Sequence, residues 1–276
     1  MLLFLLACAP EPAPPVTPDA TASTADCLAD PACTDVLVVA HRGYHANTPE
    51  NSLGAVEATA TLGAGLAEVD VRHTRDGALV ILHDDTVDRT TDGVGEVAQL
   101  TADEVAALRL DDGESTVPTF AEVLAVAVRT GIGVYVDTKT DRVDLVTAEI
   151  LAAGAEGLAL VRKDAGSLGP ALDAGLHVLA PISTIDELDA IAPTLPPDAF
   201  VEISATTPEA DLVAAVRAYG LRAQQDVFIG DGAWVLQGST DGWAMFLDSG
   251  VQIPQSEYPD GLLQAVQSGA LPGAVP

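Results

Sequence analysis

The chain has 276 residues, a length that suits one large α/β domain after a short N-terminal tail. Hydrophobic residues make up 48% and aromatic residues only 4%, so the core must consist mostly of Ala, Val, Leu and Ile. The formal net charge of −29 argues against nucleic acid as a partner, since binding it needs a basic face, and should repel anionic membranes and attract divalent cations. We expect most of the acidic residues simply to form a solvated surface.

The N-terminus begins with a seven-residue apolar run that is too short to span a bilayer. The end of this run, together with the next residue, gives Leu5-Leu6-Ala7-Cys8, which resembles a bacterial lipobox, in which the cysteine becomes lipidated. We interpret residues 1–8 as a signal peptide and the Pro-, Thr- and Ala-rich residues 9–35 as a flexible tether. This predicts an exported lipoprotein of the cell envelope, periplasm or cell surface, held at the membrane only by its lipid. The alternative is a chance apolar N-terminus on a cytosolic protein.

Cys27 and Cys33 are the only other cysteines. In an exported chain their spacing of six permits a small disulfide loop, whereas in a cytosolic one they would be free thiols. No cluster of histidine or cysteine nearby suggests zinc. The sequence leaves the two alternatives open.

Short apolar strands alternate with helical stretches from residue 36 onward, which predicts a single α/β domain over 36–276. Predicted helices cover 51–64, 101–110 and 119–131. Predicted strands cover 36–41, 66–74, 78–84 and 133–139, with more near 158, 177, 199, 221 and 250. This order favours a TIM (β/α)8 barrel over an open doubly wound sheet, because no G-x-G-x-x-G follows the first strand. Residues 85–118 form a polar insert, and an insert of this length is usually functional.

Glu68 and Asp70 lie two residues apart on a strand, so both point to the same face. Two carboxylates on one face of an apolar strand repel each other unless they share a cation, and oxygen ligands suit Ca²⁺ or Mg²⁺. The alternative is a strand edge exposed to solvent. Asp137 and Lys139 are also two residues apart on a predicted strand. In one interpretation Asp137 completes the cation site and Lys139 holds an anion. In the other, the two form an ordinary ion pair.

The position of each histidine along its strand indicates whether it is a candidate for the site. If Asp76-Gly77 is the tip of a two-residue hairpin, Asp70 faces His83, which makes His83 a site candidate. His73 lies at an odd offset from the acidic pair and should point to the other face, at the surface. His41 and Arg42 end the first strand, where a barrel gathers its active site. His45 and His177 are interpreted as ordinary loop and strand residues.

Ordered motifs across residues 36–140 are similar to the signature of the glycerophosphodiester phosphodiesterase family. They are HRG at 41–43, PEN at 49–51, E-V-D at 68–70, T-R-D-G at 74–77, H-D-D-T-V-D-R-T-T at 83–91 and P-T-F-A-E-V-L at 118–124. The resemblance implies a distorted TIM barrel that hydrolyses glycerophosphodiesters, which are small-molecule substrates, to glycerol 3-phosphate and an alcohol.

The resemblance also implies roles for individual residues. His41 falls on the catalytic base and His83 on the catalytic acid; Glu68, Asp70 and Asp137 fall on the metal ligands, with Glu50 close by, and Arg42 and Lys139 fall where phosphate is held. The chain departs from the family in carrying Asp137-x-Lys where most members have Glu-x-Lys, and in lacking the late Trp-Thr-Val-Asn strand.

Two rival functions remain. The related sphingomyelinase D group shares the Asp-x-Lys pattern, so a lyase that forms a cyclic phosphate from a lysophospholipid or sphingomyelin is one alternative. A non-catalytic, cation-binding surface module is the other, although a decayed enzyme would be expected to have lost a catalytic residue, and every matched position is filled. The sequence leaves the alcohol head group, the preferred metal and the oligomeric state open.

Overall fold

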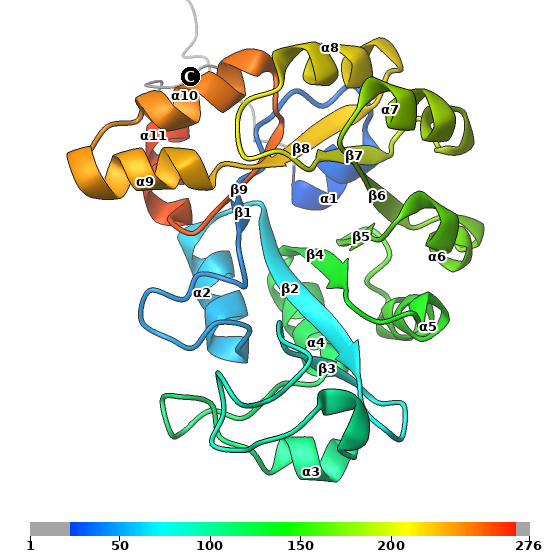
Figure 1. Cartoon of the computed structure of the whole chain (residues 1–276), viewed down its shortest axis with the longest axis vertical. Coiled ribbons are helices and arrows are strands. Elements are labelled where there is room, and N and C mark those ends of the chain that lie inside the picture. The colour runs from blue at the N-terminus through cyan, green and yellow to red at the C-terminus, as the bar shows by residue number, and fades with distance from the viewer. Residues whose placement is uncertain (1–22, 269–276) are drawn as a thin grey trace, which may run out of the picture.

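The computed structural model describes residues 23–268, so the predicted signal peptide and lipidated Cys8 lie outside the described residues. Eight parallel strands form a closed barrel, and Figure 1 shows the helices arranged around it. The barrel strands are β1 Val39–Ala40, β2 Leu66–His73, β4 Gly133–Thr138, β5 Ala159–Arg162, β6 His177–Ile182, β7 Phe200–Ile203, β8 Arg222–Asp226 and β9 Ile253–Ser256. The predicted TIM barrel is therefore confirmed.

Strand β1 closes the barrel, because Val39 pairs with Leu66 of β2 on one side and with Gln255 of β9 on the other. It is only two residues long, shorter than the predicted strand at 36–41. The helices are α1 Thr24–Ala29, α2 Leu53–Leu62, α3 Ala102–Ala106, α4 Phe120–Thr130, α5 Val143–Ala153, α6 Gly169–Asp173, α7 Ile185–Ile191, α8 Ala210–Ala218, α9 Phe228–Gln237, α10 Asp241–Ser249 and α11 Pro259–Gln267, with 3-10 turns η1 Val97–Gln99, η2 Ala165–Ser167 and η3 Ala192–Thr194.

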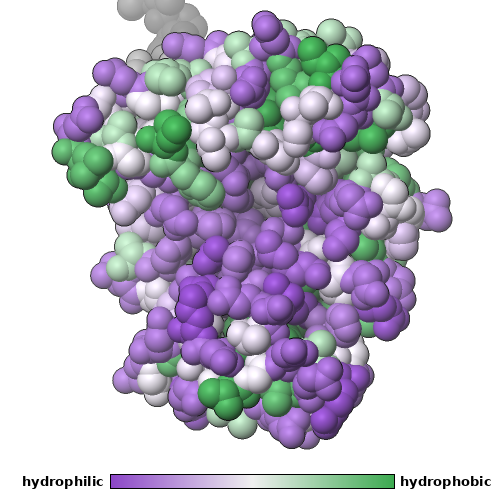
Figure 2. Space-filling view, in the orientation of Figure 1, coloured by the Kyte–Doolittle hydropathy of each residue, from purple (hydrophilic) through white to green (hydrophobic). Residues whose placement is uncertain are grey.

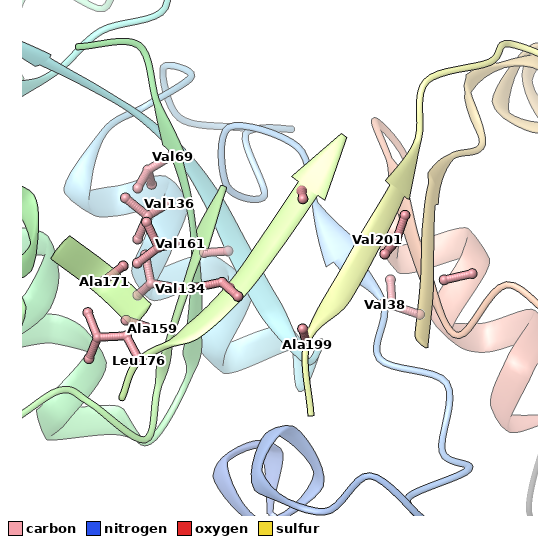
Figure 3. Packing of buried hydrophobic residues seen from close by; sticks show 14 of the residues in the cluster. Val38, Val69, Val134, Val136, Ala159, Val161, Ala171, Leu176, Ala199 and Val201 are labelled. Carbon is pink, nitrogen blue, oxygen red and sulfur yellow. The ribbon is translucent and has the colours of Figure 1, made fainter. Parts of the chain in front are cut away.

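The alternation of side chains along the strands separates two cores. Outward-facing residues such as Val69, Val136 and Val161 form a cluster with the surrounding helices, and Figure 3 shows them beside Ala171 and Leu176. Inward-facing apolar residues form a second cluster inside the barrel, toward the N-terminal ends of the strands. Because the even-numbered positions of β2 face inward, its two carboxylates project into the barrel, as the period of two requires.

The register of the hairpin between β2 and the strand that follows it differs from the one predicted from the sequence. Strand β3, Leu79–Ile81, runs antiparallel to β2 and stands outside the barrel. The backbone of Thr74 bonds to that of Ala78, so Arg75, Asp76 and Gly77 form a three-residue loop with Gly77 at φ 86°. The register is therefore one residue away from the two-residue hairpin, and Leu82, not His83, lies opposite Asp70.

The insert at 85–118 has a small core of its own. Five aliphatic side chains of the insert form a buried cluster with Val80 of β3 and with Leu82: Val87, Val97, Val105, Leu110 and Val117. Helix α3 lies here, and Thr101 and Glu104 form a capping box at its start. The insert is thus a folded element at the edge of the barrel mouth, and Figure 1 shows it extending beyond β3.

Residues 23–35, which the sequence prediction assigned to the tether, instead pack beneath the barrel. Helix α1 buries Cys27 and Leu28 against the inner core, and Cys27 forms a disulfide with Cys33. The guanidinium of Arg222 donates to the carbonyl oxygens of Cys27 and Leu28, each at 2.6 Å. The folded domain therefore starts about a dozen residues earlier than its predicted boundary. Within residues 23–268, no helix is both long and apolar enough to cross a bilayer.

Candidate active site

The polar residues of the barrel interior gather at the carboxyl ends of the strands. Glu68, Asp70 and Asp137 lie on β2 and β4, and Asp70 and Asp137 are paired in the strand register. Figure 2 shows a hollow lined by hydrophilic side chains in the middle of this face, between α9 and the insert that carries α3. This is the face on which barrel enzymes build their sites.

The three carboxylates form a compact cluster. One oxygen from each of Glu68, Asp70 and Asp137 lies within 4.8 Å of the others. Asn51 fixes Asp70, because its side-chain amide donates to Oδ2 at 2.7 Å and its oxygen accepts from the Asp70 backbone at 3.2 Å. Burial, followed by the charges of Asp70 and Asp137, raises the pKa of Glu68 well above its usual value.

Two basic side chains, those of Lys139 and Arg162, lie beside the carboxylate cluster. The ammonium of Lys139 lies 2.6 Å from Asp137 and 3.2 Å from Asp70. Burial works against the charged form of Lys139, but the two carboxylates outweigh it and raise its pKa. Arg162 on β5 bonds both to Asp137 at 3.2 Å and to Glu202 on β7 at 2.7 Å. Asp137 thus has two basic neighbours and is held in place by both.

The donor set fits a hard divalent cation. All three candidate ligands are carboxylates, which Ca²⁺ and Mg²⁺ prefer, and they are mutually close in a buried setting. Among residues 23–268 this is the cluster of three or more acidic, histidine or cysteine ligands that meets these distances. A cation would offset the repulsion that raises the pKa of Glu68. Glu50, a possible fourth ligand in the sequence analysis, lies outside the cluster and pairs with arginines instead.

The loop after β1 explains why the chain has His41-Arg42-Gly43 there. Arg42 adopts a positive φ of 55°, and at Gly43 a Cβ would collide with Ala55. This turn aims the backbone N–H of Arg42 at Glu68, 2.7 Å away, and lets its guanidinium reach Glu50 at 2.9 Å. The Nε atom of Arg42 is buried and has no hydrogen-bond partner among the described residues, so a donor is left for a ligand. Strained backbone of this kind is typical of functional sites.

His41 is oriented from the opposite end of the chain. Its Nδ1 lies 2.6 Å from Oε1 of Glu257, the residue that follows β9, and its Nε2 lies 3.9 Å from Glu68. Burial opposes ionisation of Glu257, but hydrogen bonding to His41 and the charges of His41 and His45 lower its pKa. With Nδ1 donating to a carboxylate, Nε2 is the ring nitrogen left to accept a proton.

His83 has a carboxylate partner of its own, since its Nδ1 lies 2.8 Å from Asp84. A hydrogen bond from Arg89 lowers the pKa of Asp84, and burial raises it. The hydrogen bond outweighs burial, so the pKa of Asp84 lies below its usual value. Arg89 also bonds to Glu50 at 2.7 Å, and Glu50 bonds to Arg42. A continuous chain of ion pairs therefore connects His83 on the insert side to the loop after β1.

The far side of the mouth, at β7 to β9, is acidic. Asp226 accepts from the amides of Gln224 at 3.1 Å and Gln255 at 2.9 Å. Burial, followed by the charge of Glu202, raises the pKa of Asp226 to about 6. The aromatic ring of Phe228, at the start of α9, lies 5.0 Å from the ring of His41. This side therefore offers acceptors and an apolar wall next to the imidazole.

The structure brings most sequence-predicted residues together and adds others. His41, Arg42, Glu68, Asp70, Asp137 and Lys139 are joined by direct contacts. His73 points away from the carboxylates and bonds to Thr140 at 2.7 Å. Glu257, Asn51, Arg89 and Arg162 were not assigned roles from the sequence. Glu257 had a signal, because it is an acidic residue within the last predicted strand, near 250, whereas Arg89 and Arg162 had none beyond their charge.

Part of the chain is similar in sequence to known phosphodiesterases. Residues 41–163 match the model of the glycerophosphoryl diester phosphodiesterase family. Human glycerophosphodiester phosphodiesterase 1 is 36% identical over 112 residues, which cover 38% of this chain and 34% of that protein. The glycerophosphodiester phosphodiesterase of Caldanaerobacter subterraneus is 49% identical over 77 residues, 28% of this chain and 31% of that protein. The chain thus spans about a third of the length of these curated relatives.

Solved structures share the whole fold. A glycerophosphoryl diester phosphodiesterase from Parabacteroides distasonis superposes with a TM-score of 0.75 at 22% identity, covering 91% of this chain and 93% of that one. An Oleispira antarctica phosphodiesterase, solved with the product sn-glycerol-3-phosphate, gives a TM-score of 0.64 at 23% identity over 83% of this chain and 96% of its own. Residues 41–163 are therefore similar to the glycerophosphoryl diester phosphodiesterase family, and the solved structures share the barrel fold of the chain.

Proposed function

We propose that this protein hydrolyses glycerophosphodiesters to glycerol 3-phosphate and an alcohol, with the help of a divalent cation. The observation that carries the proposal is the pairing of each candidate catalytic histidine with a carboxylate, His41 with Glu257 and His83 with Asp84, beside a carboxylate cluster. The product complex of the Oleispira antarctica protein supports the same product for this chain.

Phosphate binding is assigned to the cationic side of the mouth. Arg42, whose Nε makes no hydrogen bond and lies 3.9 Å from Asp70, would offer a donor to a phosphoryl oxygen, and Lys139 supplies a second positive charge. A divalent cation, Ca²⁺ or Mg²⁺, held by Glu68, Asp70 and Asp137 would polarise the phosphorus when bound. Since the protein carries a net charge of −29, these local charges must overcome long-range repulsion of the anionic substrate.

His41 is the proposed base. Glu257 holds its Nδ1, so Nε2 is free to take the proton from the glycerol hydroxyl next to the phosphodiester. The hydroxyl oxygen then attacks phosphorus, and the bond from phosphorus to the alcohol breaks. This yields a cyclic glycerol phosphate and leaves one proton on His41.

His83 is the proposed acid, which protonates the departing alcohol through Nε2 while Asp84 holds Nδ1. The difference in exposure supports this assignment, since the side chain of His83 is 35% exposed and that of His41 14%. The leaving alcohol departs from the more open side. In the second half, His83 takes a proton from water, hydroxide opens the ring, and His41 returns its proton to the glycerol oxygen.

A cyclising lyase of the sphingomyelinase D type is the second candidate, and Asp137-x-Lys139 is the observation that favours it. Such an enzyme would carry out only the first half of the reaction and release the cyclic phosphate. The hydrolase is preferred because the insert at 85–118 keeps the Arg89 network that links both halves of the site.

We also propose that the chain is a lipoprotein of the cell envelope, anchored through Cys8. The support is the lipobox-like Leu5-Leu6-Ala7-Cys8 and the disulfide of Cys27 with Cys33, which suits an oxidising compartment. Metabolic labelling with a fatty acid in a bacterial host tests it: Cys8→Ser should abolish labelling, and an unlabelled parent protein would contradict the anchor.

The activity is tested by enzymatic detection of glycerol 3-phosphate released from glycerophosphocholine. Release should require Ca²⁺ or Mg²⁺ and stop with a chelator, and His41→Ala should lack it. Equal release by parent and His41→Ala would contradict the proposal, as would release that a chelator leaves unchanged.

A further inference from the structure

Helix α9 presents an apolar stripe to solvent. Phe228, Ile229, Val235 and Leu236 are 37%, 49%, 55% and 82% exposed. Their spacing of i, i+1, i+7 and i+8 puts them on one side of the helix. A surface helix normally turns such a stripe toward the core, so α9 is inverted relative to the usual pattern.

The orientation of α9 is fixed by its inner side. Its buried residue Asp231 accepts from the Trp243 indole at 2.8 Å, from the Ser256 hydroxyl at 2.6 Å and from the Glu257 backbone at 2.8 Å. Gly230 packs so closely on α10 that a Cβ there would collide with Trp243. Turning the apolar stripe inward would move Asp231 away from these three donors and leave them unpaired, so the buried contacts of Asp231 hold the stripe toward solvent.

Neighbouring elements extend the stripe. Met245 on α10 is 53% exposed, and Figure 2 shows hydrophobic side chains gathered over α9 and α10. Single exposed apolar residues are ordinary, but a contiguous group usually marks a contact surface. We define the α9–α10 surface as Phe228, Ile229, Val235, Leu236 and Met245.

The surface is continuous with the mouth of the barrel. Helix α9 starts two residues after β8, and the ring of its first residue, Phe228, lies 5.0 Å from the ring of His41. Anything that covers the stripe therefore lies next to the candidate active site. A partner that supplies lipid-derived diesters would be well placed there.

Charge decides between possible occupants. The sequence from residue 223 to residue 276 has no Lys, Arg or His, and Asp241 and Asp248 flank the stripe on α10. Anionic lipid would therefore be repelled, whereas a zwitterionic surface would not. A second copy of the chain is disfavoured, since each carries a net charge of −29. A single acyl chain would need a groove, and a convex helix face leaves it half in water.

We propose that the α9–α10 surface docks on a zwitterionic lipid surface, with α9 lying in the interface as amphipathic helices do. The predicted anchor at Cys8 would keep the chain near a membrane, because residues 9–22 between Cys8 and the described chain can span at most about 45–50 Å when extended. The inference concerns lipid contact and does not depend on the reaction catalysed.

Vesicle co-sedimentation tests the proposal on the full chain carrying Cys8→Ser, so that no acyl chain is attached. The parent should sediment with phosphatidylcholine vesicles and less with vesicles that contain phosphatidylglycerol. Leu236→Glu should lower the partition coefficient about tenfold or more, because a buried leucine would be replaced by a charge. Leu151→Glu, at a residue 43% exposed on α5, is the matched control and should bind like the parent.

Circular dichroism and turnover of soluble glycerophosphocholine serve as folding controls, since Leu236 lies outside the proposed catalytic machinery. Equal vesicle binding by Leu236→Glu and the parent would overturn the proposal and point to the N-terminal segment. No binding by the parent, together with self-association that Leu236→Glu removes, would overturn it in favour of a second copy. A protein without phosphodiesterase activity that still binds vesicles through Leu236 would leave this inference standing.

Discussion

The Nδ1 atom of His41 lies 2.6 Å from Oε1 of Glu257, although 216 residues separate the two in the sequence. Closure of the barrel creates this contact, because β1 pairs directly with β9 and each residue follows the end of its strand. The carboxylate fixes the imidazole tautomer and stabilises its protonated form during turnover. Glu257 is therefore a positioning residue for the proposed base.

Glu257→Gln should lower kcat at least tenfold and leave KM nearly unchanged, because the amide keeps a contact to His41 but removes the charge that stabilises the imidazolium. Steady-state kinetics with glycerophosphocholine measures this. Glu149→Gln, a partly buried glutamate on α5, should behave like the parent protein. A rise in KM at constant kcat would assign Glu257 to substrate binding instead.

His41→Ala and His83→Ala should each reduce turnover about 10²-fold or more, the usual contribution of general acid–base catalysis. His73→Ala is the matched control, since His73 is on the same strand as the carboxylates but bonds to Thr140 on the other side. Initial rates at saturating metal and substrate separate the three variants. Near-parental turnover in both His41→Ala and His83→Ala would contradict the mechanism.

Asp70→Asn and Asp137→Asn should weaken divalent-cation binding more than tenfold, because each removes a charged oxygen from a three-carboxylate cluster. Isothermal titration with Ca²⁺ and with Mg²⁺ measures the change and also identifies the preferred metal. Asp144→Asn, on the exposed side of α5, should bind the metal as the parent does. Unchanged affinity in both cluster variants would place the metal elsewhere.

Asp226 should make stability depend on pH. Burial and the charge of Glu202 raise its pKa from the usual 3.8 to about 6, so between these values the folded state holds a proton that the unfolded state has lost. Its stabilising contribution is complete below about pH 4 and is lost as the pH rises through 6. Asp226→Asn should therefore exceed the parent at pH 8 by on the order of 1–3 kcal/mol in free energy of unfolding.

The difference between Asp226→Asn and the parent should shrink toward pH 4, where both side chains are neutral. Urea unfolding across this pH range measures it, and the amide can retain the contacts to Gln224 and Gln255 through its oxygen. Asp248→Asn on α10 is the exposed control. A constant difference at all pH values would mean that Asp226 does not hold a proton in the folded state.

The disulfide of Cys27 with Cys33 should stabilise the packing of α1 beneath the barrel. Replacing both cysteines by serine should lower the free energy of unfolding by about 2 kcal/mol, the chain-entropy value for so short a loop. Denaturant titration of the full chain measures the loss. Unchanged stability would show that α1 is held by its contacts alone, including those that Arg222 makes with its carbonyl oxygens.

The barrel was predictable because most of its strands, such as β2, β4, β5 and β6, are short apolar runs, although β8 and β9 are largely polar. The carboxylates of β2 were predictable for the same reason, since a period of two fixes the face on which Glu68 and Asp70 lie. The register of β3 was not, because a three-residue and a two-residue loop around Gly77 read alike in sequence, and the structure has the longer loop.

Other features depend on contacts that no local pattern records. Glu257 acts on a residue at the other end of the chain, so only closure of the barrel reveals its partner. Helix α1 lies in a stretch whose composition is typical of a tether, yet Leu28 is fully buried beneath the barrel. The outward stripe of α9 could not be predicted, because its orientation is set by the buried contacts of Asp231 with Trp243 and Ser256.

The most direct test of the central claim is ³¹P NMR of the phosphorus products. Glycerophosphocholine and lysophosphatidylcholine would each be incubated with the protein in Ca²⁺, in Mg²⁺ and in chelator. The account predicts metal-dependent accumulation of glycerol 3-phosphate from glycerophosphocholine, with any cyclic phosphate only transient. A cyclic phosphate that persists as the final product would contradict it in favour of the lyase, and unchanged substrate in the presence of bound metal would contradict both.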